Sequence, residues 1–403
     1  MGRSVLRENL ILGTLSGPAS AVSILIPLYL THLGYPVGAV GGVLAMAAVA
    51  TLLSRLPVPK LYRPERSRLL LLATLVGGGL SFAVLPFMDS IAVFAIVLIV
   101  NRALYGLATT FFLARYLDLI ADGTNRRQAM GWYGGIQAIG YTSSNVLVGV
   151  SADLFGYTAA FLYGTVFTTL AVIPLIGARD LPPKAVAERQ ETVNRPGGVR
   201  GWLHGVADPG LWGVLNVSTW NNVFHLTLVS FFPVYAAAVG MGAAQVGIAR
   251  GLYSGINAVG RPLAGAALAR FSLRQVSYLG LGLIATLLFA LPFAQSFTIV
   301  AVLFLTMAAA RAIVVVANAA ALAEEVDETR VSRGAATSSY SASADVSSIV
   351  APAASGFVAS VFGIFGMFPI VAAAAFGCFV AGDLLVERWR SRVRGTREAR
   401  LAS

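Results

Sequence analysis

Long apolar segments alternate with short polar ones along the whole chain. The apolar runs are roughly 18 to 25 residues long, which is the length of an α-helix that crosses the ~30 Å hydrocarbon core of a bilayer. The first run continues to Leu30, past a segment (Ala19-Ser20-Ala21) that resembles a signal-peptidase site, which favours an uncleaved first span. The pattern predicts twelve transmembrane helices, at 9–32, 37–55, 69–88, 91–114, 128–150, 158–178, 211–237, 244–268, 275–294, 298–322, 334–360 and 364–386.

The longest polar interruption lies near the middle of the chain and divides the spans into two sets of six. We predict an N-terminal six-helix bundle (1–178), a cytoplasmic linker (179–210), a C-terminal six-helix bundle (211–387) and a basic cytoplasmic tail (388–403).

The composition agrees with an integral membrane protein, since 57% of the 403 residues are hydrophobic and only 12% are charged. Soluble domains contain about 25% charged residues. The net charge of +11 could indicate a nucleic-acid partner, but basic residues also accumulate in the cytoplasmic loops of membrane proteins. We therefore expect a lipid bilayer and no nucleic acid. Cys378, the single cysteine, excludes an internal disulfide.

The basic residues orient the predicted spans. Of 29 lysines and arginines, 25 lie in segments that this map places in the cytoplasm, Arg115 among them, and none lies in an outside loop. This asymmetry predicts that both termini are cytoplasmic. The remaining four lie inside spans and are Arg102, Arg250, Arg261 and Arg311.

The two halves repeat one another. Arg55 and Arg261 are 206 positions apart, and Arg102 and Arg311, in spans four and ten, are 209 apart. Repeats of this kind enclose a central pathway with the substrate near the middle of the membrane.

With these features the chain resembles the major facilitator superfamily over essentially its whole length. The family's loop motif, G-x-x-x-D-R/K-x-G-x-R/K, is matched in the second half by Gly265, Arg270 and Arg274, with Ala269 in the acidic position, and in the first half by Arg55 and other basic residues. Its Arg-x-x-x-Gly pattern in span four is matched by Arg102 and Gly106. Its span-five antiporter pattern is not matched, which argues against a drug/proton antiporter.

The resemblance implies two six-helix bundles around a central cavity, a secondary transporter working by alternating access, and a gating role for the loop motif. We expect Arg55, Gly265, Arg270 and Arg274 in that role. Arg261, near the cytoplasmic end of its span, is expected to take part in gating or to extend toward the membrane surface.

Ionisable side chains within spans are costly, so each one is a functional candidate. Arg102, Arg250, Arg311, His225 and Asp345 fall near the middle of their predicted spans. Polar neighbours at helical spacing share their faces. The predicted substrate-binding residues are Arg102, Tyr105, Asn222, His225, Arg250, Tyr253, Asn257, Arg311 and Asp345.

Asp345 has two compatible interpretations. It could neutralise a buried arginine, with Arg311, Arg250 or, across the two halves, Arg102 as the partner. It could also be the proton-accepting coupling site or bind a substrate amine. Three deep arginines against one acid favour an anionic or carboxylate-bearing cargo, since arginine binds such groups bidentately. A gating role for Arg102 and a helix-contact role for His225 stay open.

The sequence contains no motif of an enzyme or an ATPase, and no cofactor or metal ligand set is recognised. We therefore expect a non-enzymatic, monomeric transporter of a small organic solute, coupled to protons or another ion, in a prokaryotic plasma membrane. The alternatives are an exporter of hydrophobic drugs or metabolites and, from another class, a non-transporting receptor or scaffold with the same fold.

Overall fold

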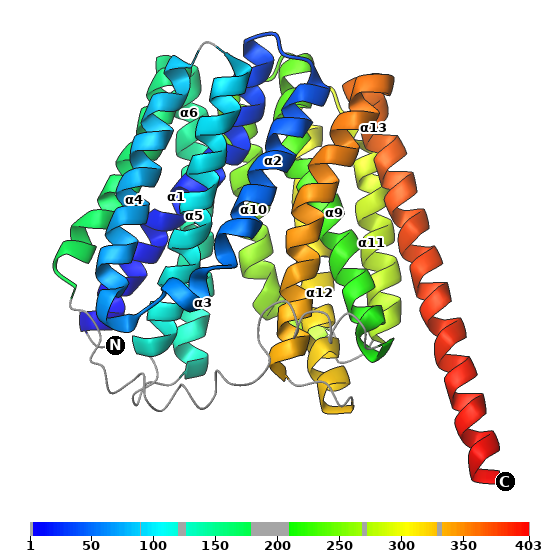
Figure 1. Ribbon diagram of the computed structural model, residues 1–403. Coiled ribbons are helices and arrows are strands. Elements are labelled where there is room, and N and C mark those ends of the chain that lie inside the picture. Colours follow the sequence, from blue (N-terminus) through cyan, green and yellow to red (C-terminus); the bar gives the residue numbers. More distant parts are fainter. Residues whose placement is uncertain are drawn as a thin grey trace.

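The computed structural model describes residues 3–88, 90–119, 126–178, 209–267, 272–328 and 333–402. Every secondary-structure element assigned in these ranges is helical (Figure 1). The N-terminal half comprises α1 (Arg3–His32), α2 (Val37–Arg55), α3 (Val58–Leu61), η1 (Pro64–Arg66), α4 (Ser67–Val84), η2 (Leu85–Phe87), α5 (Ile91–Leu119) and α6 (Arg126–Ile176). The C-terminal half comprises η3 (Pro209–Leu211), α9 (Trp212–Ala238), α10 (Ala243–Ala267), α11 (Leu273–Ala290), η5 (Leu291–Phe293), α12 (Phe297–Glu328) and α13 (Arg333–Ala402).

Two of these helices, α6 and α13, continue through a glycine with a non-helical backbone. Gly156 has a φ of 81° and Gly363 a φ of 72°, which is a conformation that glycine adopts without steric cost. The predicted breaks between spans five and six and between spans eleven and twelve fall at or beside these glycines. At Gly363 the chain reverses and runs back along the bundle, as the orange and red parts of α13 show in Figure 1.

Eight helices of the described chain are long and apolar enough to cross a membrane. Two of them, Gly135–Ile176 and Ser339–Trp389, contain the glycine bends and are 42 and 51 residues long. Helices α9 and α10, over predicted spans seven and eight, are not among the eight. The all-helical membrane fold is therefore confirmed, whereas the number of twelve spans stays a prediction.

The internal repeat is visible in the hydrogen bonds of the two halves. Tyr29 on α1 donates from its hydroxyl to the Pro86 carbonyl at 3.0 Å, and Tyr235 on α9 donates to the Leu291 carbonyl at 2.9 Å. Tyr29 and Tyr235 are 206 positions apart. Each tyrosine thus connects the first helix of its half, α1 or α9, to the 3-10 helix, η2 or η5, that follows the third predicted span of that half.

We call the end of the bundle that carries the two chain ends the terminal face, and the opposite end the distal face (Figure 1). Near the distal face, the two halves touch through glycines. A Cβ atom on Gly41 of α2 would lie 2.7 Å from the Gly356 Cα of α13, and one on Gly149 of α6 would lie 2.9 Å from the Gly247 Cα of α10. Only glycine permits such close backbone approach, so the distal side is closed by direct helix contact.

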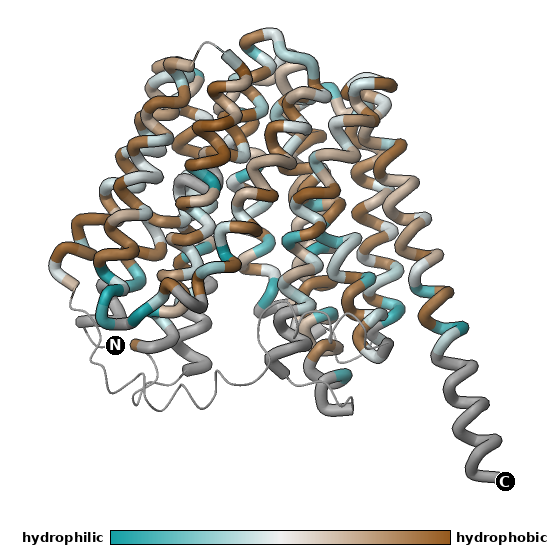
Figure 2. Tube along the Cα trace, viewed as in Figure 1, coloured by the Kyte–Doolittle hydropathy of each residue, from teal (hydrophilic) through white to brown (hydrophobic). Residues whose placement is uncertain are grey.

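The outer surface is apolar. Large hydrophobic side chains point outward, including Leu80 at 63%, Phe155 at 73% and Phe357 at 71% exposed. Apolar colours dominate the helices in Figure 2, and hydrophilic ones gather toward the terminal face. An apolar belt of this extent is what lipid tails cover, so the chain is a multi-pass membrane protein.

One basic residue lies elsewhere than the sequence suggested. Arg115, assigned above to a cytoplasmic segment, lies within α5 and is only 2% exposed. Its Nε donates to Glu8 of α1 at 3.0 Å, and its Nη1 donates to Ser67 of α4 at 2.7 Å. Helix α5 extends to Leu119, beyond the predicted end at residue 114, and the carboxylate on α1 offsets the cost of burying the guanidinium.

Candidate central site

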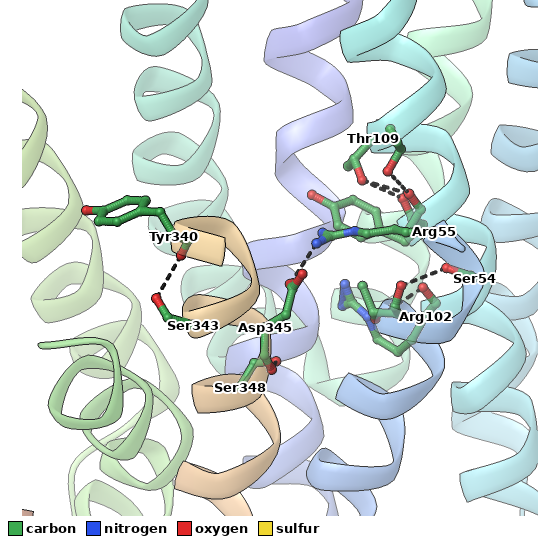
Figure 3. A network of polar contacts seen from close by, with 12 residues as sticks. Ser54, Arg55, Arg102, Thr109, Tyr340, Ser343, Asp345 and Ser348 are labelled. Carbon is green, nitrogen blue, oxygen red and sulfur yellow. Dashed lines mark hydrogen bonds and ion pairs between the residues drawn. The ribbon is translucent and has the colours of Figure 1, made fainter. Parts of the chain in front are cut away.

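An ion pair joins the two halves. The Arg55 Nη1 at the end of α2 lies 2.7 Å from the Asp345 Oδ1 of α13, and the two side chains are 37% and 24% exposed. Figure 3 shows the Asp345 carboxylate pointing across to Arg55. Arg250, Arg311 and Arg102 were the partners expected for Asp345 from the sequence. The structure pairs it with Arg55 instead, because α13 packs along α2 rather than against the faces of the other three.

Arg102 lies beside this pair on the N-terminal half (Figure 3). Its guanidinium carbon is 4.6 Å from the centre of the Tyr105 ring, one helical turn further along α5. A cation held over an aromatic face is stabilised by the ring quadrupole, so the predicted proximity of these two residues is observed. Within the described part of the chain, no carboxylate forms an ion pair with Arg102.

In the C-terminal half the predicted residues form two contacts. The His225 Nδ1 of α9 lies 3.1 Å from the Tyr253 hydroxyl of α10, with the rings 5.4 Å apart and nearly parallel. The Arg311 Nη2 of α12 donates to the Asn222 Oδ1 at 3.3 Å. Arg311 is 9% exposed, and its Nε is buried without a hydrogen-bond partner among the described residues.

Asn257 and Arg261 lie further along α10. Asn257 is 7% exposed, and its Oδ1 is buried with no hydrogen-bond partner in the described chain. Arg261 is exposed, near the terminal end of α10. Like Arg102 and Arg311, it forms no ion pair with a described carboxylate. Among the described residues, no carboxylate therefore pairs with these three arginines, whereas Asp345 already has a cation.

Arg250 has a different environment from the other arginines. It is 6% exposed and donates to the Ser23 carbonyl at 3.0 Å, the Ser23 hydroxyl at 2.9 Å and the Val229 carbonyl at 2.8 Å. Ser23 belongs to α1 and Val229 to α9. Arg250 thus forms a contact between the two halves, and its place in the substrate site stays a prediction.

The predicted loop-motif residues that the structure describes lie on three helices, with Arg55 on α2, Gly265 on α10 and Arg274 on α11. Arg274, at the start of α11, binds Glu387 of α13 through two hydrogen bonds of 2.7 Å and lies 2.9 Å from Asp383. All three residues belong to the C-terminal half. Gly265 lies in α10, and Arg270 lies outside the described residues.

Two further contacts between helices that the sequence did not predict involve acidic residues outside the predicted site. One is the buried pair of Glu8 and Arg115. The other is Asp153 of α6, whose carboxylate accepts from the backbone N–H groups of Ala243 at 2.7 Å and Ala244 at 2.9 Å. The carboxylate thereby satisfies the N-terminus of α10 from the opposite half. The position of Asp153 close to a predicted span end was the signal that the sequence offered. Its partner helix, α10, is distant in the sequence.

The arrangement offers cationic donors, and the part of the chain that the structure describes contains no metal-binding set. No group of three or more histidine, cysteine or acidic residues is close enough to hold a metal ion in the described ranges. The uncompensated cations Arg102 and Arg311 come from α5 and α12, helices that belong to different halves. Their guanidinium groups offer the planar donors that bind carboxylates and phosphates.

Solved structures support this class of fold. A bacterial homologue of the human lysosomal transporter Spinster, in an inward-facing and unoccupied conformation, superposes with a TM-score of 0.70 at 14% identity, covering 95% of this chain and 94% of that one. The same homologue in an inward-facing and occupied conformation also gives 0.70 at 14% identity, with coverages of 95% and 96%. The nucleoside transporter NupG gives 0.69 at 13% identity, with coverages of 95% and 99%. No curated protein matches the sequence.

The fold and the paired halves thus define an integral membrane protein whose fold is shared by solved transporters. Residues 227–402 match the model of the Major Facilitator Superfamily. This match covers the C-terminal half, and together with the fold of the whole chain it agrees with the family resemblance recognised from the sequence.

Proposed function

We propose that the chain is a secondary active transporter of a small organic solute that carries a carboxylate or another anionic group. The observation that carries this proposal is the charge imbalance among the interior side chains. Arg102 and Arg311 have no described acidic partner, and neither has the exposed Arg261 at the terminal end of α10, while Asp345 is engaged by Arg55. A buried cation is costly unless an anion approaches it, and an anionic cargo would supply that charge.

The geometry of Arg311 supports the same cargo. Its Nη2 is held by Asn222, which fixes the plane of the guanidinium, and its buried Nε has a hydrogen still to donate. His225 and Tyr253, stacked on each other nearby in the same half, offer a polar and aromatic wall. Residues on Arg102's side, including Tyr105, would complete the site from the N-terminal half.

We assign the coupling role to Asp345. Protonation would remove the charge that holds Arg55, so the link between the halves on the terminal side would weaken. Proton binding and opening toward the terminal face would then favour each other, as linkage requires. The alternating movement is a rocking of the two halves around the central arginines.

The charge map supports an orientation. Because basic residues accumulate on cytoplasmic segments, we place the terminal face and both chain ends in the cytoplasm of a prokaryotic cell, with the protein in the plasma membrane. The protein would act as a monomer, since each chain supplies both halves of the pathway.

A thermal-shift screen of the purified protein tests the proposal. A library of carboxylates, neutral metabolites and cationic drugs is applied at two pH values, because a ligand that binds the folded state raises the melting temperature. Carboxylate hits lost in Arg311→Met but kept in the matched surface variant Arg274→Met support an anion site. Hits confined to hydrophobic or cationic compounds would favour a drug exporter, and binding without flux in proteoliposomes would favour a receptor or scaffold.

A further inference from the structure

Arg250 connects two carbonyl groups that occupy equivalent positions in the two halves. Its Nη1 donates to the Ser23 carbonyl of α1 at 3.0 Å and to the Val229 carbonyl of α9 at 2.8 Å. Ser23 and Val229 are 206 positions apart, the spacing of the internal repeat. A single guanidinium therefore bridges the pseudo-symmetric first helices of the two halves.

Each of these carbonyls has a proline at the position that would normally donate a hydrogen bond to it. In an α-helix the carbonyl of residue i accepts from the N–H of residue i+4. Four residues after Ser23 stands Pro27, and four residues after Val229 stands Pro233. Proline has no N–H, so neither helix can make its usual bond at this point. Arg250 donates at both places.

The burial of Arg250 makes this contact strong. The side chain is 6% exposed, and a third bond, from its Nη2 to the Ser23 hydroxyl at 2.9 Å, uses the other terminal nitrogen. Hydrogen bonds from a charged donor are roughly twice as strong as neutral ones. The surrounding low dielectric strengthens them further and penalises their loss.

The contact also lies on the side where the halves are closed. Arg250 is the eighth residue of α10, which begins at Ala243, so it sits about 10 Å from the distal end of that helix. Gly247, one turn earlier, meets Gly149 of α6 at the distal closure. Asn145 of α6 donates to the backbone carbonyl of Arg250 at 3.4 Å and to the Ser254 hydroxyl at 3.2 Å.

We propose that Arg250 is a clamp that holds the distal side closed by bonding to the carbonyls at Ser23 and Val229, where Pro27 and Pro233 leave the helix donor position open. Opening the distal side separates α1 from α10 and breaks both bonds to Ser23. The bond to Val229 lies within the C-terminal half and persists. Arg250 thus favours the distal-closed state. This role rests on the proposed alternating access, but it requires no knowledge of the cargo.

Distances between spin labels test the clamp without any transport assay. In a Cys378→Ser background, Leu33→Cys and Ala238→Cys place labels on exposed positions at the distal face, and Leu61→Cys with Leu385→Cys does so at the terminal face. In Arg250→Met we expect at least a threefold larger population with the longer distal distance and a shorter terminal distance. A general loss of packing between the halves would instead broaden both distance distributions without shifting them in opposite directions.

The prolines provide a second arm that keeps the arginine and is compatible with folding. Pro27→Ala with Pro233→Ala restores the helix N–H groups, which then compete with Arg250. We expect a smaller distal opening in the same direction, and no further opening when Arg250→Met is added, because the changes act on one contact. Pro174→Ala is the control, because Pro174 lies inside α6, one turn after the exposed Leu170. It should leave both distances unchanged.

The results separate the clamp from the transport proposal. Distal distances in Arg250→Met and in the double proline variant that equal those of the parent would overturn the clamp, whatever the cargo. An opposite shift of the two label pairs supports the clamp even when the thermal-shift screen finds no anionic ligand.

Discussion

The Asp345 carboxylate of α13 lies 2.7 Å from the Arg55 guanidinium at the end of α2, so an ion pair spans the two halves toward the terminal face. On the distal side, the link is made by Arg250 and by glycine contacts. In the described conformation, a separate set of contacts thus joins the two halves on each side of the central arginines. Alternating access requires that these two sets of contacts open in turn, and the opening of each side can be tested separately.

Asp345→Asn should open the terminal side, which is the opposite of the change expected for Arg250→Met. The amide cannot hold Arg55 as an ion pair, so the terminal label distance should lengthen and the distal one should not. The pair is partly exposed, so its loss should cost only about 0.2–1 kcal/mol of folding stability. Spin-label distances and denaturant unfolding measure the two quantities.

The same variant addresses coupling. If Asp345 carries the proton, the pH dependence of the terminal label distance in the parent protein should be absent in Asp345→Asn. Asp383→Asn, which removes an acid of the C-terminal half bound to Arg274, is the control and should keep that dependence. A pH response that survives unchanged in Asp345→Asn would assign the coupling to another residue.

Arg311→Lys should weaken binding of a carboxylate ligand by more than tenfold while the protein still folds. Lysine keeps the charge but loses the planar donors that bind a carboxylate bidentately. Titration of the ligand found by thermal shift would measure the change in Kd. Arg274→Lys keeps a charge at the exposed terminal end and should bind like the parent. Equal affinities of Arg311→Lys and the parent would exclude a bidentate contact.

Gly41→Ala and Gly42→Ala form a matched pair of adjacent substitutions in α2. A Cβ on Gly41 would lie 2.7 Å from both the Gly356 Cα and the Pro352 carbonyl oxygen, whereas one on Gly42 meets nothing within 4 Å. Gly41→Ala should therefore force the distal side apart, with a longer distal label distance, and Gly42→Ala should not. Identical distances in the two variants would contradict the assignment of this contact to the distal closure.

The buried pair of Glu8 and Arg115 should matter for stability rather than for transport. Both side chains are 2% exposed, and they join α1 to α5 within the N-terminal half. Arg115→Met leaves the carboxylate without its cation and should cost about 3–5 kcal/mol of unfolding free energy. Arg115→Met combined with Glu8→Gln should recover part of that loss. Unfolding titrations of the parent, Arg115→Met, Glu8→Gln and the double variant measure the coupling.

The architecture could be predicted because the bilayer imposes it on the sequence. A helix must satisfy its own backbone hydrogen bonds in lipid, so long apolar runs reveal helices directly, and α2 has the predicted bounds. The internal repeat was found from the spacing of arginine pairs, and it appears in the structure as the matching bonds of Tyr29 and Tyr235.

The partners of the charged residues could not be predicted in the same way. Helical spacing places Tyr105 beside Arg102 because both lie on one helix. It cannot tell which of several helices faces Asp345, and for this reason three arginines but not Arg55 were expected as its partners. Likewise, the contact of Arg250 with Ser23 could not be predicted, because nothing local distinguishes Arg250 from Arg311.

The sequence by itself determined the class of this protein. Its apolar runs, its repeat and the distribution of its arginines can be read directly along the chain, because the bilayer and the water on either side of it determine which residues can lie where. The tertiary structure decided which charges meet. Ser23 and Arg250 are 227 positions apart, and Arg55 and Asp345 are 290 apart. Contacts at such separations depend on how the two halves dock, because a guanidinium buried away from water is stabilised only by the acceptors that the docked helices bring to it.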